Sequence, residues 1–103
     1  MILYNVTINV EDQLHDEWLE WMLNEHIHKV MLSRMFISYK MFRIISRLPE
    51  ETGTTYSIQY FADSLDKYDI YREVYSPVLQ QETLDRFGAS NAPMAFRTVL
   101  EEV

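Results

Sequence analysis

Hydrophobic and polar residues alternate strictly along the first ten positions of the chain. One face of this segment would carry Ile2, Tyr4, Val6, Ile8 and Val10, and the other would carry Leu3, Asn5, Thr7 and Asn9. A period of two residues is typical of a half-buried strand. Residues 36–46, 54–62 and 94–102 are predicted to be strands as well, and the second of these segments is rich in Thr, Tyr, Ile and Phe.

Two segments between these strands show the apolar spacing of helices. The first helix is predicted from residue 13 to residue 32, after an N-cap at Glu11–Asp12. The second begins after Asp63–Ser64 and ends at Phe87–Gly88, because glycine commonly follows the last turn of a helix. Ser76–Pro77 lies inside this helix, and proline is comfortable only in a first turn. We therefore expect a kink or a restart, with Ser76 as the cap.

The predicted order of elements is β-α-β-β-α-β over a single domain of residues 1–103. This order is the ferredoxin-like pattern, an α+β fold in which two helices cover one face of an antiparallel sheet. The second and third strands would form a hairpin across the turn cluster Pro49–Gly53. The opposite face of the sheet has no cover within one chain.

The strand pattern permits a consistent assignment of the two sheet faces. The residues predicted to face the helices are Tyr4, Val6, Ile8, Tyr56, Ile58, Tyr60, Phe96 and Leu100, whereas the uncovered face would carry Leu3, Asn5, Thr7, Ser57, Gln59, Phe61, Arg97 and Val99. Such a mixed face can be solvated, can stack a ligand or can pair with a second subunit. We expect a homodimer through this face, with Asn5, Thr7, Ser57, Gln59 and Arg97 at the interface.

Composition narrows the classes of protein to consider. Apolar residues make up 48% of the chain and aromatic residues 14%, which argues against disorder. The absence of cysteine excludes disulfides, iron–sulfur clusters and cysteine nucleophiles. A net charge of −7, without a run of basic residues, argues against a nucleic-acid partner. With neither a signal peptide nor a long apolar segment, we expect a cytoplasmic protein without a membrane partner.

The first helix concentrates the residues that could carry chemistry. At about 100° per residue, Trp18 and His26 fall within one apolar arc, whereas His28 points the opposite way. His26 and His28 therefore cannot bind one metal ion together. His15 shares the arc, but eleven residues of helix, roughly 16 Å, separate it from His26. The sequence accordingly predicts neither a metal site nor a cofactor.

Five residues are candidates for contact with a ligand, namely His26, Trp18, Tyr60, Arg43 and Arg97. The simplest interpretation of His26 is a core histidine bonded to a backbone carbonyl, a tyrosine or Glu25. The alternative is a general base or hydrogen-bond donor in a pocket between helix and sheet. The arginines could be exposed or ion-paired, could anchor the carboxylate of a small acid, or could form a salt bridge across subunits.

The run Trp18–Met22 followed by Glu25-His26-Ile27 resembles the helix of the dimeric α/β-barrel superfamily. Within it, the whole chain resembles a small family known only as a domain of unknown function (number 4286), through Met1–Thr7, Thr54–Phe61, Arg86–Gly88 and Phe96–Thr98. The resemblance implies two sheets paired face to face into a barrel. Members of the superfamily include cofactor-free monooxygenases, isomerases and haem enzymes. His28 departs from the pattern, which has proline there.

Two classes of function fit these observations. We favour a small-ligand-binding or interaction module that binds a small apolar or aromatic molecule, because no nucleophile, base and orienting residue are visible at suitable spacing. The alternative is a cofactor-independent enzyme for a small aromatic or polyketide-like molecule, with His26 as acid or base and Arg43 or Arg97 as anchor. A cavity that joins His26 to Trp18 and Tyr60 would support a ligand site.

Overall fold

Four antiparallel strands form one sheet in the order β2-β3-β1-β4 in the computed structural model, which describes residues 1–103. The strands are β1 (Ile2–Val10), β2 (Ser38–Ile44), β3 (Thr54–Ala62) and β4 (Ala95–Glu101). The helical segments are α1 (Asp12–Trp21), η1 (Met22–His26), α2 (Ile27–Leu32), α3 (Leu65–Ile70), η2 (Tyr71–Tyr75) and α4 (Ser76–Phe87). The predicted ferredoxin-like α+β order is confirmed.

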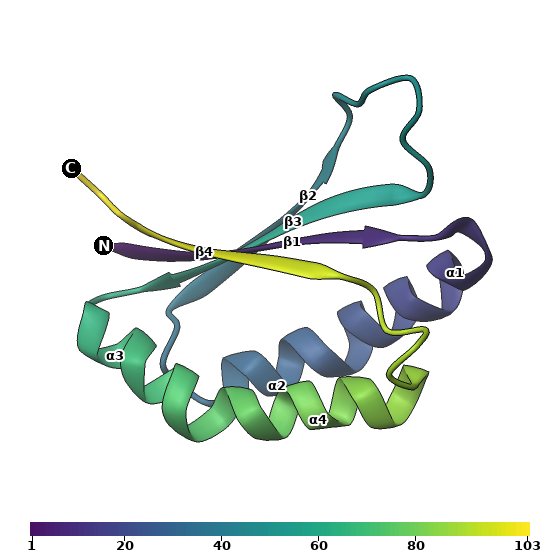
Figure 1. Cartoon of the computed structure of the whole chain (residues 1–103). Helices are drawn as coiled ribbons and strands as arrows, with labels where there is room; N and C mark the ends of the chain where they lie inside the picture. Colours follow the sequence, from purple (N-terminus) through teal and green to yellow (C-terminus); the bar gives the residue numbers. More distant parts are fainter.

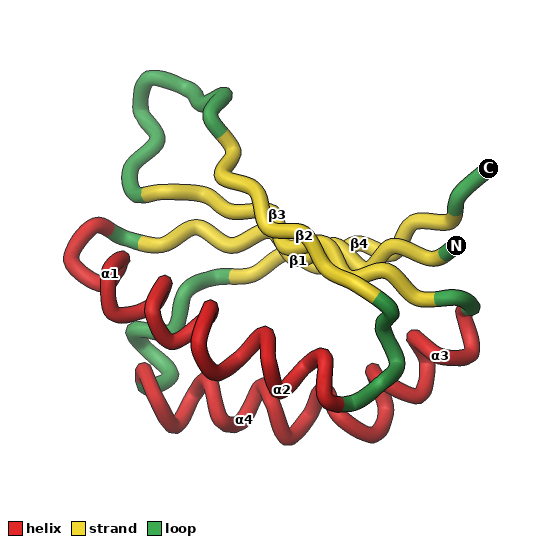
Figure 2. Tube along the Cα trace, turned by 180° about the vertical axis from the view of Figure 1, so that it is seen from behind, coloured by secondary structure: helices red, strands yellow, loops and turns green.

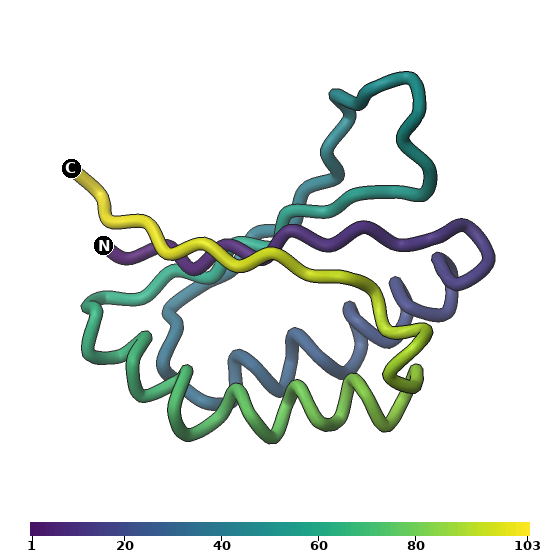
Figure 3. Tube along the Cα trace, viewed as in Figure 1, coloured from purple at the N-terminus to yellow at the C-terminus, as the bar shows by residue number.

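All helical segments lie on one side of the sheet (Figures 1 and 2). The segments α1, η1 and α2 form one continuous helix, and α3, η2 and α4 form a second beside it. Each helix is interrupted in the middle by five residues with π-helical geometry. The two ends of the chain lie side by side (Figure 3), where the Glu102 amide donates to the Met1 carbonyl at 3.0 Å.

The predicted cap at Ser76 is wrong, because the chain is already helical at Tyr75 and no side chain caps α4. The helix is nevertheless irregular at the predicted place, since α4 begins at Ser76 directly after the π turn η2. Proline at position 77 lacks an amide hydrogen and would collide with the carbonyl four residues earlier, that of Glu73. Glu73 lies in η2, where the regular ladder of hydrogen bonds is already interrupted. The π turn therefore accommodates Pro77 without ending the helix. The cap predicted at Asp63–Ser64 is present, since Ser64 Oγ accepts from the Lys67 amide at 3.3 Å.

The central strands β1 and β3 have the predicted bounds and faces. Tyr4 pairs with Tyr60 and Val6 pairs with Ile58, and these side chains are buried beneath the helices. Asn5 pairs with Gln59 and Thr7 pairs with Ser57, and these residues lie on the uncovered face. Strict alternation is informative in these strands because one face packs against helices and the other does not.

The predicted faces of β4 are wrong. Arg97 pairs with Val6, and Val99 pairs with Tyr4, so both point toward the helices. Phe96 and Leu100 lie on the uncovered face instead, where they are 66% and 44% exposed. Hydrophobicity misled the prediction here because β4 is an edge strand and nearly all its side chains are exposed, whichever face they occupy.

The uncovered face has a polar centre and an apolar rim. Ser57 Oγ donates to Asn5 Oδ1 at 2.6 Å, and Asn5 Nδ2 donates to Thr7 Oγ1 at 3.0 Å. The apolar side chains around them are Leu3, Phe42, Ile44, Phe61, Phe96 and Leu100. The loop of residues 45–53 rises on this side of the sheet (Figure 1). No helix of the structure has the length and apolar character needed to cross a bilayer.

Candidate functional site

A cavity of about 210 Å³ lies between the sheet and the two helices. Its walls come from β1, β3 and β4 on one side and from both long helices on the other. Thirteen of its 19 lining residues are hydrophobic, which suits an apolar molecule. A dry cavity of about 150 Å³ can already bind benzene, so this volume has room for a small aromatic molecule with substituents.

The cavity opens toward solvent between β4 and α4. Gln80 and Leu84 on the helix, and Arg97 on the strand, all line the cavity and are all exposed. The deeper wall consists of buried side chains, including Trp18, Ile58 and Tyr60. A ligand could therefore enter beside Arg97 and place its apolar part against the aromatic wall.

His26 lines this cavity from the end of η1. Its Nδ1 atom is buried and has no hydrogen-bond partner, although nearly all buried polar atoms in proteins have one. Neither a backbone carbonyl, nor a tyrosine, nor Glu25 supplies that partner. The imidazole packs beside the Trp21 ring, with 4.9 Å between ring centroids. The structure thus leaves one buried polar atom of this site free to bind something else.

Burial lowers the pKa of the His26 imidazole to about 4. The nearby carboxylate of Glu82 opposes this effect, whereas the positive charges of Arg97 and Lys29 add to it. Glu82 is itself paired with Lys29 at 3.1 Å and does not line the cavity. His26 is therefore neutral at pH 7, with one ring nitrogen able to donate and the other able to accept.

Three buried tyrosines, Tyr4, Tyr60 and Tyr71, line the same cavity as His26. The Tyr4 ring centroid lies 6.0 Å from that of Tyr60 and 5.8 Å from that of Tyr71. Burial raises the pKa of all three hydroxyls above the usual value of 10. The three phenols remain protonated near neutral pH and can donate hydrogen bonds to a ligand.

Tyr71 is a site residue that the sequence analysis missed. It belongs to a helical series of tyrosines, Tyr68, Tyr71 and Tyr75, whose simplest role is packing on the sheet. Tyr71 lies in η2 and His26 lies in η1, so both π segments contribute to the cavity. Such segments occur frequently at functional sites. The only available signal was the clustering of tyrosines on a helix that faces Tyr4 and Tyr60.

Arg97 lies on β4 at the open side of the cavity. No carboxylate forms an ion pair with it, unlike Arg72 and Arg86, which pair with acidic side chains. Its positive charge lies near enough to Tyr4 to oppose part of the rise that burial causes in the pKa of that hydroxyl. Arg97 thus belongs to the ligand candidates, and its predicted place on the uncovered dimer face is wrong.

The structure brings together four of the five predicted ligand candidates. Trp18, Tyr60, His26 and Arg97 all line the cavity. Arg43 does not, since it lies on the other edge strand, β2, opposite Tyr56. Both arginines point to the helix side of the sheet, but two strands separate them. The expectation that Arg43 could anchor a ligand beside His26 is therefore wrong.

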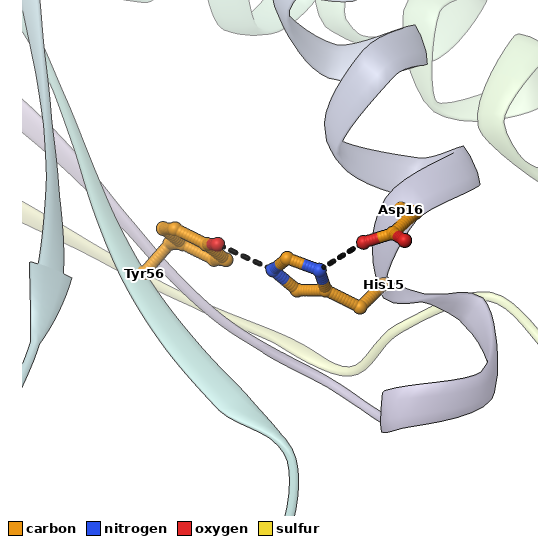
Figure 4. A network of polar contacts seen from close by, with 3 residues as sticks. All are labelled: His15, Asp16 and Tyr56. Carbon is orange, nitrogen blue, oxygen red and sulfur yellow. Dashed lines mark hydrogen bonds and ion pairs between the residues drawn. The ribbon is translucent and has the colours of Figure 1, made fainter.

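A second polar cluster joins the start of α1 to β3 (Figure 4). His15 Nε2 lies 2.5 Å from the Tyr56 hydroxyl, and His15 Nδ1 lies 2.9 Å from Asp16 Oδ1. The Trp18 ring packs on Tyr56, with 5.4 Å between centroids. None of the three clustered residues lines the cavity. The cluster therefore positions Trp18, which does line the cavity, without meeting a ligand there.

A wider groove of about 990 Å³ lies between the uncovered face and the loops at one end of the sheet. Only five of its 17 lining residues are hydrophobic, and Glu11, Glu50 and Glu51 contribute negative charge. No buried polar atom without a partner belongs to it. No group of three or more His, Cys, Asp or Glu side chains is arranged to hold a metal ion. The apolar cavity is therefore the candidate site.

Comparison with protein families identifies the chain. The model of DUF4286, a domain of unknown function, matches residues 1–103. The chain belongs to this family. The DUF4286 family is the one that the sequence resembles, so that prediction is confirmed. No curated protein has a sequence that matches this DUF4286 chain.

Solved structures share the fold of this DUF4286 member at low identity. The protein At3g17210 from Arabidopsis thaliana has a TM-score of 0.73 and 11% identity, with coverage of 100% of this chain and 96% of its own. A putative antibiotic biosynthesis monooxygenase from Deinococcus radiodurans has a TM-score of 0.68 and 11% identity, with coverage of 100% and 93%. A dimeric ferredoxin-like protein from an uncultured marine organism has a TM-score of 0.50 and 11% identity, with coverage of 99% and 96%. These likenesses establish the ferredoxin-like fold alone.

Proposed function

We propose that this DUF4286 protein binds a small apolar or aromatic molecule in the cavity between sheet and helices, and that a polar group of this molecule bonds to His26. The observation that carries the proposal is the buried, unpartnered Nδ1 atom of His26 in the wall of a mainly apolar cavity. Leaving such an atom unpaired costs roughly 1–3 kcal/mol. A ligand that supplies the partner would recover that free energy on binding.

The aromatic wall supports the same class of ligand. Trp18, Trp21 and the buried tyrosines present flat surfaces and, in the tyrosines, hydroxyl donors. Aromatic pairs contribute about 0.5–1.5 kcal/mol beyond the area that they bury. An apolar ring with one or two polar substituents would therefore use both features of the cavity.

A cofactor-independent enzyme is the second candidate, and the presence of His26, Tyr71 and Arg97 in one cavity favours it. The low pKa of His26, about 4, weighs against a strong general base, because a base works best with a pKa near the working pH. The binding module is therefore the function that the geometry supports better. A reaction that needs only a neutral imidazole as hydrogen-bond donor stays compatible with this site.

We propose further that the protein is a homodimer through the uncovered sheet face. That face joins a hydrogen-bonded centre around Asn5 and Ser57 to an apolar rim that includes Phe96 and Leu100. Interfaces of stable dimers combine apolar contact area with a limited number of hydrogen bonds in this manner. Thr7 and Gln59 extend the polar centre, and Arg97 plays no part in it.

The ligand proposal is tested with two probes that differ in one hydroxyl, 2-naphthol and naphthalene. Wild-type protein should bind 2-naphthol, and His26→Phe should weaken that binding about fivefold to tenfold, as expected for loss of one hydrogen bond in an apolar site. Naphthalene affinity should change less than twofold in the same variant. Chemical-shift titration by NMR measures both dissociation constants.

The matched control is His28→Phe, because His28 is exposed on the same helix. This variant should bind both probes as the wild type does. Failure of the wild type to bind either probe, or equal loss of both probes in His26→Phe, would contradict the proposed role of His26.

A further inference from the structure

Arg97 is the only charged side chain among the residues that line the cavity. The chain as a whole has 16 acidic residues against nine Lys and Arg, yet no aspartate or glutamate lines the cavity. In a protein with a net charge of −7, a cavity with a positive charge at its mouth is a local reversal of the overall field.

The Arg97 guanidinium is available to a ligand. It forms no ion pair, although paired basic residues such as Lys29 and Arg86 occur on the nearby helices. It is exposed on the edge strand, so a ligand can reach it from solvent, and within the cavity it lies close enough to interact with the buried Tyr4 hydroxyl. A guanidinium offers up to five N–H donors in a plane, and this geometry matches a carboxylate.

Several of the polar groups that share the cavity with Arg97 can donate hydrogen bonds. The hydroxyls of Tyr4, Tyr60 and Tyr71 stay protonated because burial raises the pKa of each. His26 is neutral and keeps one ring N–H to donate. An array of donors without a carboxylate favours a negative group on the ligand, because charge-assisted hydrogen bonds are about twice as strong as neutral ones.

We infer that the cavity selects a small aromatic monoanion, with the ring against Trp18 and the tyrosines and the acidic group, a carboxylate, at Arg97. This inference rests on the proposed function, because it names the charge and chemical class of the ligand that the same cavity holds. The ring would occupy the deep apolar wall, and the carboxylate would remain near the exposed mouth. The carboxylate would thus stay partly in solvent and paired with Arg97. Burial of a carboxylate without a positive partner would cost far more free energy than burial of a neutral group.

Two probes of nearly identical shape, 2-naphthoate and 2-naphthamide, isolate the charge. At low ionic strength the wild type should bind 2-naphthoate about tenfold more tightly than 2-naphthamide. Arg97→Gln should abolish this preference and leave 2-naphthamide affinity within twofold of the wild type. Arg97→Lys should keep part of the preference, since it retains the charge and loses the planar fork. Isothermal titration calorimetry measures all dissociation constants.

Arg43→Gln is the matched control, because Arg43 is an exposed arginine on the helix side of the opposite edge strand. This variant removes the same charge from the protein and should leave the preference unchanged. If the wild type binds both probes equally, or if Arg43→Gln and Arg97→Gln lose the preference alike, the anion inference is overturned while ligand binding stands. If neither probe binds, the proposed function fails together with the inference.

Discussion

Burial of the His26 imidazole disfavours its charged form and couples protonation to folding. The folded pKa of about 4 lies below the ordinary value of 6.5 that the unfolded chain regains. Between these two values the unfolded state binds a proton that the folded state does not bind. Linkage therefore makes the free energy of unfolding fall as the pH drops from about 6.5 toward 4.

This linkage predicts a specific difference between the wild type and His26→Phe. Between pH 7 and pH 5 the wild type should lose up to about 2 kcal/mol more stability than the variant. At pH 7 the variant should be at least as stable, because it removes a buried polar atom that has no partner. Urea unfolding at each pH, at one fixed protein concentration, measures the difference.

His28→Phe serves as the control for charge and hydrophobicity, since His28 is exposed on α2. Its stability should follow the wild-type pH profile. Parallel profiles for all three proteins would show that His26 does not carry the predicted proton linkage.

Among the elements, the central strands were the most predictable. Val6 and Ile58 alternate with Thr7 and Ser57 because helices cover one face of these strands only. The same rule failed for β4, whose Phe96 faces away from the helices and whose Arg97 faces toward them. At an exposed edge, hydrophobicity does not report which face is covered. The uncovered face also carries apolar residues of its own.

The candidate site could be predicted in part. The helical wheel placed Trp18 and His26 on one buried face, because both fall within the apolar arc of the first helix. The π segments could not be predicted, since each spans only five residues, which is too short for its period to be told apart from that of the α-helix on either side. Tyr71, in the second of these segments, therefore looked like an ordinary packing residue.

The connection between β2 and β3 depends on Gly53. Its φ of +74° is a conformation that side-chain-bearing residues rarely adopt, and an added Cβ would lie 2.5 Å from the Val10 carbonyl oxygen. Gly53→Ala should therefore destabilise the protein by about 1–3 kcal/mol in urea unfolding. The neighbouring exposed substitution Thr52→Ala should cost less than about 0.5 kcal/mol. Equal losses would refute the role of this close contact.

At the scale of the molecule, the sheet separates two proposed surfaces. The cavity lies on its helix side, and the proposed dimer interface lies on its uncovered side. Residues of β4 alternate between the two, with Arg97 facing the cavity and Phe96 facing the interface. Occupancy of the cavity and association of subunits can therefore be altered independently by neighbouring substitutions on one strand.

The dimer proposal predicts that wild-type protein sediments at twice 12.4 kDa at micromolar concentration. Phe96→Asp should shift the protein toward the monomer, because it places a charge in the apolar rim where desolvation is costly. Val78→Asp is the control, since Val78 is 61% exposed on α4, on the helix side of the sheet. A monomeric wild type, or dissociation by both variants alike, would contradict the proposed interface.

The position of Trp18 and Trp21 gives the protein a built-in optical signal. These are the only two tryptophans in the chain, and both line the cavity. Tryptophan fluorescence responds to the polarity of its surroundings. Displacement of water from the cavity by a ligand should therefore change the wavelength and intensity of the protein's tryptophan emission. A library of colourless compounds could thus be screened with unlabelled protein.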